Sequence, residues 1–265
     1  MNNPTSPFDR EIHAEMARWR SRIEFPAGNR TEAESPERMT HTQAMLFARD
    51  LNRTYEAMKK AHRDLNQSYM DTLESLILAS EFKDGDTGSH IKRIGRFSTL
   101  ITEKLDLSRS VVEQIGLASA MHDIGKIGIP DHILLKKGRL SHSEFAVMKT
   151  HTLIGARILA GSHSEILRMA HNIALSHHEW WNGEGYPCGL KGMEIPLEGR
   201  IVALADFFDA CTSKRPYRDA LPFASVIEMI RDLSGRQFES RLVKLLLDNQ
   251  EEIKQLMKEN GQSKL

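Results

Sequence analysis

The chain has 265 residues, of which 40% are hydrophobic and 27% are charged, and its formal net charge is zero. This composition is typical of a soluble globular protein with one large domain, or with one domain and an appendage. The charge balance gives no general attraction to DNA, RNA or a membrane surface, so an anionic ligand would require a local basic cluster.

Cysteine usage and the N-terminal residues bear on the compartment. Cys188 and Cys211 are too few to form a disulfide framework. The N-terminus has no basic segment followed by an apolar core, and no apolar run reaches the ~18 residues that a membrane helix needs. We therefore expect a cytoplasmic protein with no membrane association.

Residues 1–40 are predicted to be a polar segment with one short amphipathic helix, because Ile12, Met16, Trp19 and Ile23 recur at helical spacing. A long signalling or dimerisation helix is then predicted over residues 41–80. It has a good start at Ser35-Pro36-Glu37, and neither proline nor glycine follows before Gly85.

One series in this long helix follows the alternating steps of four and three that are typical of a coiled-coil seam. It favours a parallel homodimer, while packing of the helix on its own domain remains the alternative. The series is Ala44, Ala48, Leu51, Tyr55, Met58, His62, Leu65, Tyr69, Thr72 and Leu76.

The rest of the chain, residues 81–260, is predicted to be a single all-α domain. A loop is expected at Ile127–Gly138, and a second loop, with a short strand pair as an option, at Gly189–Pro196. Helical patterns occur near residues 89–106, 110–124, 141–160, 163–178, 200–213, 222–234 and 239–258.

Two dense polar clusters stand out. His177, His178 and Glu179 precede the turn Gly185-Tyr186-Pro187, and adjacent histidines on a helix project about 100° apart, so they can reach two neighbouring ions. The second cluster is His122-Asp123-Ile124-Gly125-Lys126. A buried histidine beside a buried aspartate is costly without partners, and a metal would remove that cost.

Together these motifs resemble the HD-GYP family, a branch of the HD metal-dependent phosphohydrolases. The patterns that match are His-Asp-x-Gly-Lys and His-His-Glu-x-x-x-Gly-x-Gly-Tyr-Pro, and the resemblance covers about residues 81–250. It implies an HD-domain helical bundle with a C-terminal GYP extension, preceded here by the coiled-coil-like helix.

The resemblance also implies a ligand set for two or three divalent metal ions, iron or manganese. The core of two metals would be held by His122, Asp123, His151, His177, His178 and Asp206, with Asp123 as the bridge. His90 matches a histidine of the members with three metals. Those members place a carboxylate four residues earlier, where this chain has Asp86, which is one methylene shorter than the more familiar glutamate.

The function implied is hydrolysis of cyclic di-GMP, or a related 3′,3′-cyclic dinucleotide, to pGpG, GMP or both. A metal-bridged hydroxide near Asp123 would attack phosphorus in line, and Lys126 would offset charge on the phosphate. Further substrate contacts are expected from Tyr186, Arg215 and Arg218, while Glu179 would orient a histidine from behind.

Two readings compete with the phosphodiesterase. One is an adaptor that senses the dinucleotide, or that docks a diguanylate cyclase through the Gly-Tyr-Pro loop, with little turnover. The other is a phosphohydrolase that acts on another nucleotide. The loop also departs from the family pattern, because it reads Trp180-Trp181-Asn182-Gly183, with asparagine where the family usually has aspartate.

Overall fold

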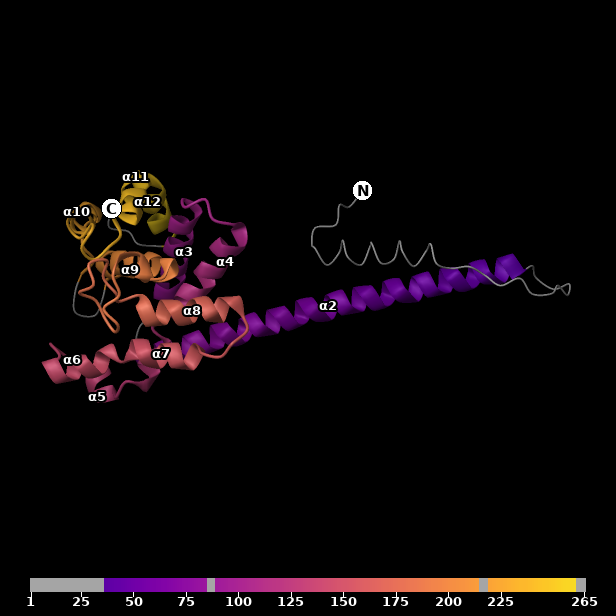
Figure 1. Cartoon of the computed structure of the whole chain (residues 1–265), viewed down its shortest axis with the longest axis horizontal. Helices are drawn as coiled ribbons and strands as arrows, with labels where there is room; N and C mark the ends of the chain where they lie inside the picture. The colour runs from indigo at the N-terminus through magenta and orange to yellow at the C-terminus, as the bar shows by residue number, and fades with distance from the viewer. Residues whose placement is uncertain (1–35, 85–88, 215–218, 261–265) are drawn as a thin grey trace. The chain divides into compact units, whose positions relative to one another are not determined.

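The computed structural model describes residues 36–84, 89–214 and 219–260, and these form helices joined by short loops (Figure 1). Within the described residues there is no strand, only one isolated bridge between Ser234 and Phe238. The predicted all-α fold class is therefore confirmed. The chain divides into two compact units, Met1–Gln67 and Ser68–Leu265.

Helix α2 spans Pro36–Asp84. Its first part, residues 36–67, belongs to the N-terminal unit. Several large apolar side chains of that part lie at the surface. The exposed large apolar residues are Met45, Leu46, Phe47, Leu51, Met58 and Leu65.

The last part of α2 belongs to the second unit, together with all the remaining elements. Its residues Tyr69, Met70, Leu73 and Ile77 pack on the core of that unit. The other helices are α3 (Ser89–Glu103), α4 (Arg109–Ala118), α5 (Asp131–Leu134), α6 (His142–Lys149), α7 (His151–Leu159), α8 (Glu165–Ser176), α9 (Leu197–Thr212), α10 (Phe223–Asp232), α11 (Ser240–Asp248) and α12 (Gln250–Glu259).

Four of these helices, α3, α4, α8 and α9, pack together in the second unit. Helix α9 packs against both α3 and α8, and α4 also contacts α3 and α8. Ile94, Phe97 and Ile101 recur on one face of α3 and are buried, so the amphipathic pattern explains why this face turns inward. The ring of Phe208 on α9 meets that of Phe97 edge to face, with 4.8 Å between centroids.

Three predicted helices are interrupted in the structure. The segment 110–124 ends as an α-helix at Ala118 and continues as the short 3-10 helices η1 (Ser119–Met121) and η2 (Ile124–Gly128). The segment 141–160 divides at Thr150, and 239–258 divides at Asn249. The hydroxyl of Thr150 donates to the carbonyl of Val147, which competes with continuation of α6.

The strand pair suggested for Gly189–Pro196 does not form. This loop instead contains a single 3-10 turn, η3 (Gly192–Glu194). The amide of Gly192 in this loop donates to the carbonyl of Trp181, while the amides of Trp181 and Asn182 donate to the carbonyls of Gln237 and Arg236.

Candidate metal centre

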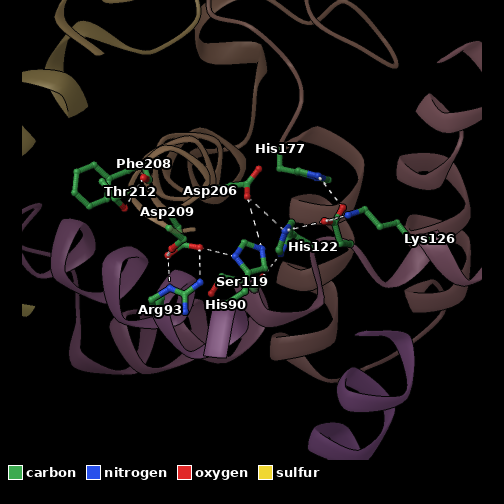
Figure 2. Close-up of polar contacts among 12 residues, drawn as sticks. His90, Arg93, Ser119, His122, Lys126, His177, Asp206, Phe208, Asp209 and Thr212 are labelled. Carbon is green, nitrogen blue, oxygen red and sulfur yellow. Dashed lines mark hydrogen bonds and ion pairs between the residues drawn. The ribbon is translucent and has the colours of Figure 1, made fainter. Parts of the chain in front are cut away.

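Seven of the predicted ligands come together in two adjoining groups, part of which Figure 2 shows. In each group the candidate ligand atoms all lie within 4.8 Å of one another. The first group is Asp123, His151, His177 and His178, and the second is His90, His122 and Asp206.

Asp123 lies where the two groups meet. Its Oδ1 is 3.3 Å from Nε2 of His151 and 3.7 Å from Nε2 of His177. Its Oδ2 is 3.2 Å from Nε2 of His122, which belongs to the other group. The carboxylate of Asp123 therefore occupies the position that the sequence analysis expected of a bridging ligand.

The contacts in the second group are longer than those around Asp123. Oδ1 of Asp206, on α9, is 3.9 Å from Nε2 of His90 and 4.0 Å from Nε2 of His122. His90 comes from the first turn of α3, so this group joins three segments that are distant in the sequence.

The backbone fixes the tautomer of three histidines. Nδ1 of His122, His151 and His177 each lies within 2.8–3.0 Å of a carbonyl oxygen, and a carbonyl can only accept. Nδ1 therefore carries the proton, and in the neutral ring Nε2 keeps a lone pair that faces Asp123. The accepting carbonyls are those of Ser119, Met148 and Ile173.

This arrangement fits divalent cations. Nε2 of His122 and Oδ1 of Asp123 are buried and make no hydrogen bond of acceptable geometry with any described residue, although His122 Nε2 is only 3.2 Å from Oδ2. Two lone pairs at that distance repel each other unless a cation or a proton lies between them. Imidazole nitrogens with carboxylate oxygens are ligands that first-row transition metals accept.

The electrostatics of the site agree with that fit. Burial alone would lower the pKa of His122, but the carboxylates of Asp123 and Asp206 outweigh it and raise this pKa to about 9. Burial would raise the pKa of Asp123, yet Lys126 and His122 hold it well below its usual range. The two carboxylates thus attract positive charge into the site.

Close backbone packing places His151 against the His122–Asp123 segment. A Cβ on Gly125 would lie 1.9 Å from the carbonyl oxygen of His151 and 2.4 Å from the amide nitrogen of Gly155. Glycine at position 125 is therefore required by the approach of η2 to α7, and not by an unusual backbone angle.

The other predicted site residues fall in different places. Lys126 reaches the centre, with Nζ 2.8 Å from Oδ2 of Asp123. Tyr186 stacks on the ring of His178, with 4.7 Å between centroids. Asp86, Arg215 and Arg218 lie outside the described residues.

The expected role of Glu179 needs correction. Its buried carboxylate accepts from the backbone amides of Cys188 and Leu190, at 2.7 and 3.0 Å, and pairs with no histidine among the residues that the structure describes. The loop folds back over Glu179, which brings these two amides to its oxygens. Glu179 therefore holds the loop that carries Tyr186.

One contact of the centre was not anticipated. Asp209, one turn beyond Asp206 on α9, contacts Nδ1 of His90 at 2.6 Å and also pairs with Arg93 (Figure 2). The spacing of three residues between Asp206 and Asp209 on a predicted helix was the available signal, because it places both on one face.

Comparison with known proteins shows the family. Residues 77–242 match the model of the HD domain, which covers more than half of the chain. The chain therefore belongs to the HD domain family, and the resemblance to its HD-GYP branch is confirmed. None of the helices in the described part of the chain is long and apolar enough to cross a membrane.

Two curated relatives and one solved structure illustrate the similarity. A cyclic di-GMP phosphodiesterase of Thermotoga maritima is 42% identical over 220 residues, which are 82% of this chain and 60% of that protein. The 3′3′-cGAMP-specific phosphodiesterase 2 of Vibrio cholerae is 39% identical over 189 residues, 71% of this chain and 36% of that protein.

The solved structure of a cyclic GMP-AMP phosphodiesterase of V. cholerae, V-cGAP3, aligns with a TM-score of 0.53 at 22% identity. The alignment covers 71% of this chain and 50% of that one, and it shows a shared fold. This chain thus spans at most 60% of the two curated relatives.

Proposed function

We propose that this chain is a metal-dependent phosphodiesterase that hydrolyses cyclic di-GMP to pGpG, GMP or both. The observation that carries the proposal is the pair of ligand groups joined at Asp123. The names of the curated relatives, which are phosphodiesterases of cyclic di-GMP or 3′3′-cGAMP, support the substrate class.

Two cations, iron or manganese, would be held by the two groups. When bound, they would make a water molecule nucleophilic near neutral pH and would neutralise charge on the phosphate. Asp86, outside the described residues, would help to hold a third cation in the manner that the family resemblance implies.

The residues around the centre would bind and orient the phosphate. Lys126 lies beside Asp123 and brings a positive charge to the edge where a non-bridging phosphate oxygen would approach. Arg215 and Arg218, as expected from the motif, would add the local basic cluster that a neutral protein needs for an anionic ligand.

Tyr186 would form one wall for a guanine base. Its ring lies beside His178, and Lys149 lies over the same ring at 5.6 Å from the centroid. An aromatic face with a cation nearby is suited to stacking of a nucleobase.

The proposed organisation places an N-terminal polar segment at residues 1–40, a signalling and dimerisation helix at 41–80, and the phosphodiesterase domain at 81–260. Exposed apolar residues on the first part of α2 support a homodimer formed through that helix, and we place the protein in the cytoplasm. A diguanylate cyclase would be a partner for the Gly-Tyr-Pro loop.

A turnover assay tests the proposal. The purified chain is loaded with Mn²⁺ or Fe²⁺, its metal content is measured, and cyclic di-GMP and 3′3′-cGAMP compete in one reaction followed by chromatography. We expect linear products, with loss of turnover in Asp123→Asn. Intact dinucleotides in a fully metallated sample would contradict the proposal, and tight binding without turnover would favour the adaptor instead.

The same competition assay tests a second candidate substrate, 3′3′-cGAMP. The V. cholerae relative is named for 3′3′-cGAMP, so faster loss of 3′3′-cGAMP than of cyclic di-GMP would assign this chain to that specificity.

A further inference from the structure

Nδ1 of His90 contacts a side chain, whereas Nδ1 of three other histidines of the centre contacts a backbone carbonyl. Its Nδ1 lies 2.6 Å from Oδ2 of Asp209. Because an ionised carboxylate only accepts, Nδ1 of His90 donates, and in the neutral ring Nε2 keeps a lone pair on the side of Asp206.

Asp209 is itself held rigidly. It is fully buried, and Arg93 donates through Nε to Oδ1 and through Nη2 to Oδ2, the second at 3.1 Å. The hydroxyl of Ser213 also donates to Oδ1, at 3.1 Å. Arg93 thus places a permanent positive charge against both oxygens of the carboxylate.

The pairing follows from the same spacing on two helices. His90 and Arg93 are three residues apart on α3, and Asp206 and Asp209 are three residues apart on α9. Each helix therefore supplies one residue to the second ligand group and one residue directly behind it, as Figure 2 shows.

We propose that Asp209, fixed by Arg93, is a positioning residue for His90 in the second ligand group. The inference rests on the proposed function, because it requires a cation at His90, His122 and Asp206. Asp209 fixes the tautomer and ring orientation of His90, and its negative charge makes Nε2 a stronger donor. Arg93 acts one step further out, by holding both oxygens of Asp209.

The first test is Asp209→Asn, which keeps the shape of the side chain and removes its charge. Mn²⁺ is titrated into the metal-free full chain by calorimetry, and bound metal is counted by elemental analysis after dialysis at limiting Mn²⁺. We expect the second cation to bind about 10–100-fold more weakly, while the first cation binds as in the unchanged chain. Thermal melting is followed in parallel.

A second variant and a matched control separate positioning from general stability. Arg93→Lys keeps the positive charge but loses the two-pronged contact, so the second cation should again bind more weakly. Glu239→Gln breaks another buried ion pair with α9, that of Glu239 with Arg200. This control should lose thermal stability without changing the affinity for either cation.

The outcomes are distinguishable. If Asp209→Asn or Arg93→Lys folds and still binds the second cation as tightly as the unchanged chain, the inference is wrong. The proposed function is not affected by that result. An equal loss of the second cation in Glu239→Gln would also overturn the inference, because the effect would then be general. An unchanged chain that binds neither Mn²⁺ nor Fe²⁺ would overturn both the inference and the proposed function.

Discussion

At the scale of single residues, the centre brings imidazole nitrogens and carboxylate oxygens together around Asp123. Backbone carbonyls fix one proton of each of three histidines on Nδ1, so in the neutral rings the Nε2 lone pairs face the carboxylate of Asp123. Lys126 is the cationic side chain recorded beside this carboxylate, with Nζ 2.8 Å from Oδ2. One cation in each group, with the carboxylate of Asp123 in contact with both, would complete the arrangement.

Replacing Lys126 by methionine should reduce turnover of cyclic di-GMP by about 10²–10³-fold, because the transition state would lose one source of charge stabilisation. Steady-state kinetics on the metal-loaded protein measures this effect. Lys137→Met removes an exposed lysine from the following loop and should leave turnover unchanged. Activity of Lys126→Met within a few-fold of the unchanged chain would show that Lys126 does not contact the phosphate.

Gly125→Ala should destabilise the fold by ~1–3 kcal/mol or more, because the new methyl group would overlap the backbone of His151 and Gly155. Urea unfolding measures the difference. Gly128→Ala is the matched control, since the nearest atoms there belong to the flexible end of Ile154 and can move aside. Equal losses in the two variants would contradict the close backbone approach.

At the scale of elements, α6 begins with a well-defined capping box. The hydroxyl of Ser141 accepts from the amide of Glu144, and the Glu144 carboxylate accepts from the Ser141 amide and from Lys136. The hydrogen bond from Lys136 is the largest of the causes that lower the pKa of Glu144 to about 2, and the contacts with Ser141 come next. Helix α6 precedes the break at Thr150 that sets the start of α7 and the position of His151.

A titration of Glu144 tests this cap. Because its pKa is lower in the folded chain, the stabilising contacts are complete above the ordinary value of 4.5 and are lost as the pH falls through about 2. Carbon-detected NMR of the carboxyl group should give a midpoint near 2, and Lys136→Met should raise it. A midpoint that stays the same in this variant would contradict the assigned cause.

The elements also show what the sequence could and could not predict. Helical periodicity located most helices of the second unit but missed α5, which lies within the predicted loop Ile127–Gly138. The two motifs identified residues that the structure brings together at Asp123. The sequence pattern did not predict the helix breaks at Thr150 and Asn249, because a hydrophobic pattern continues across a local change of backbone direction. The sequence did not predict the hydrogen-bond partners of Glu179 and Asp209, because these contacts form only in the folded chain.

At the scale of the whole molecule, the first part of α2 is an unusual surface for a soluble monomer. Leu65 is 68% exposed and Met58 47% exposed, and both belong to the series with coiled-coil spacing. Tyr69, near the end of that series, instead packs within its own domain and contacts the hydroxyl of Ser164. The series is therefore interrupted at Tyr69, although Leu76, further along the same series, is 54% exposed.

Changing Leu51 and Leu65 together to lysine should convert the proposed dimer into monomers, because two buried positive charges per chain would oppose pairing. Light scattering measures the mass. The matched control adds the same charges one residue further along, at Asn52 and Asn66, and should keep the dimer. An unchanged mass in the leucine variant would favour packing of α2 within its own chain.

Anomalous X-ray scattering from crystals of the as-isolated protein, combined with elemental analysis, tests the proposed metal centre most directly. We predict one cation among His151, His177 and His178, another among His90, His122 and Asp206, and the carboxylate of Asp123 in contact with both. Crystals of a folded protein with no anomalous peak at either group, after supplementation with Mn²⁺ or Fe²⁺, would contradict the metal centre.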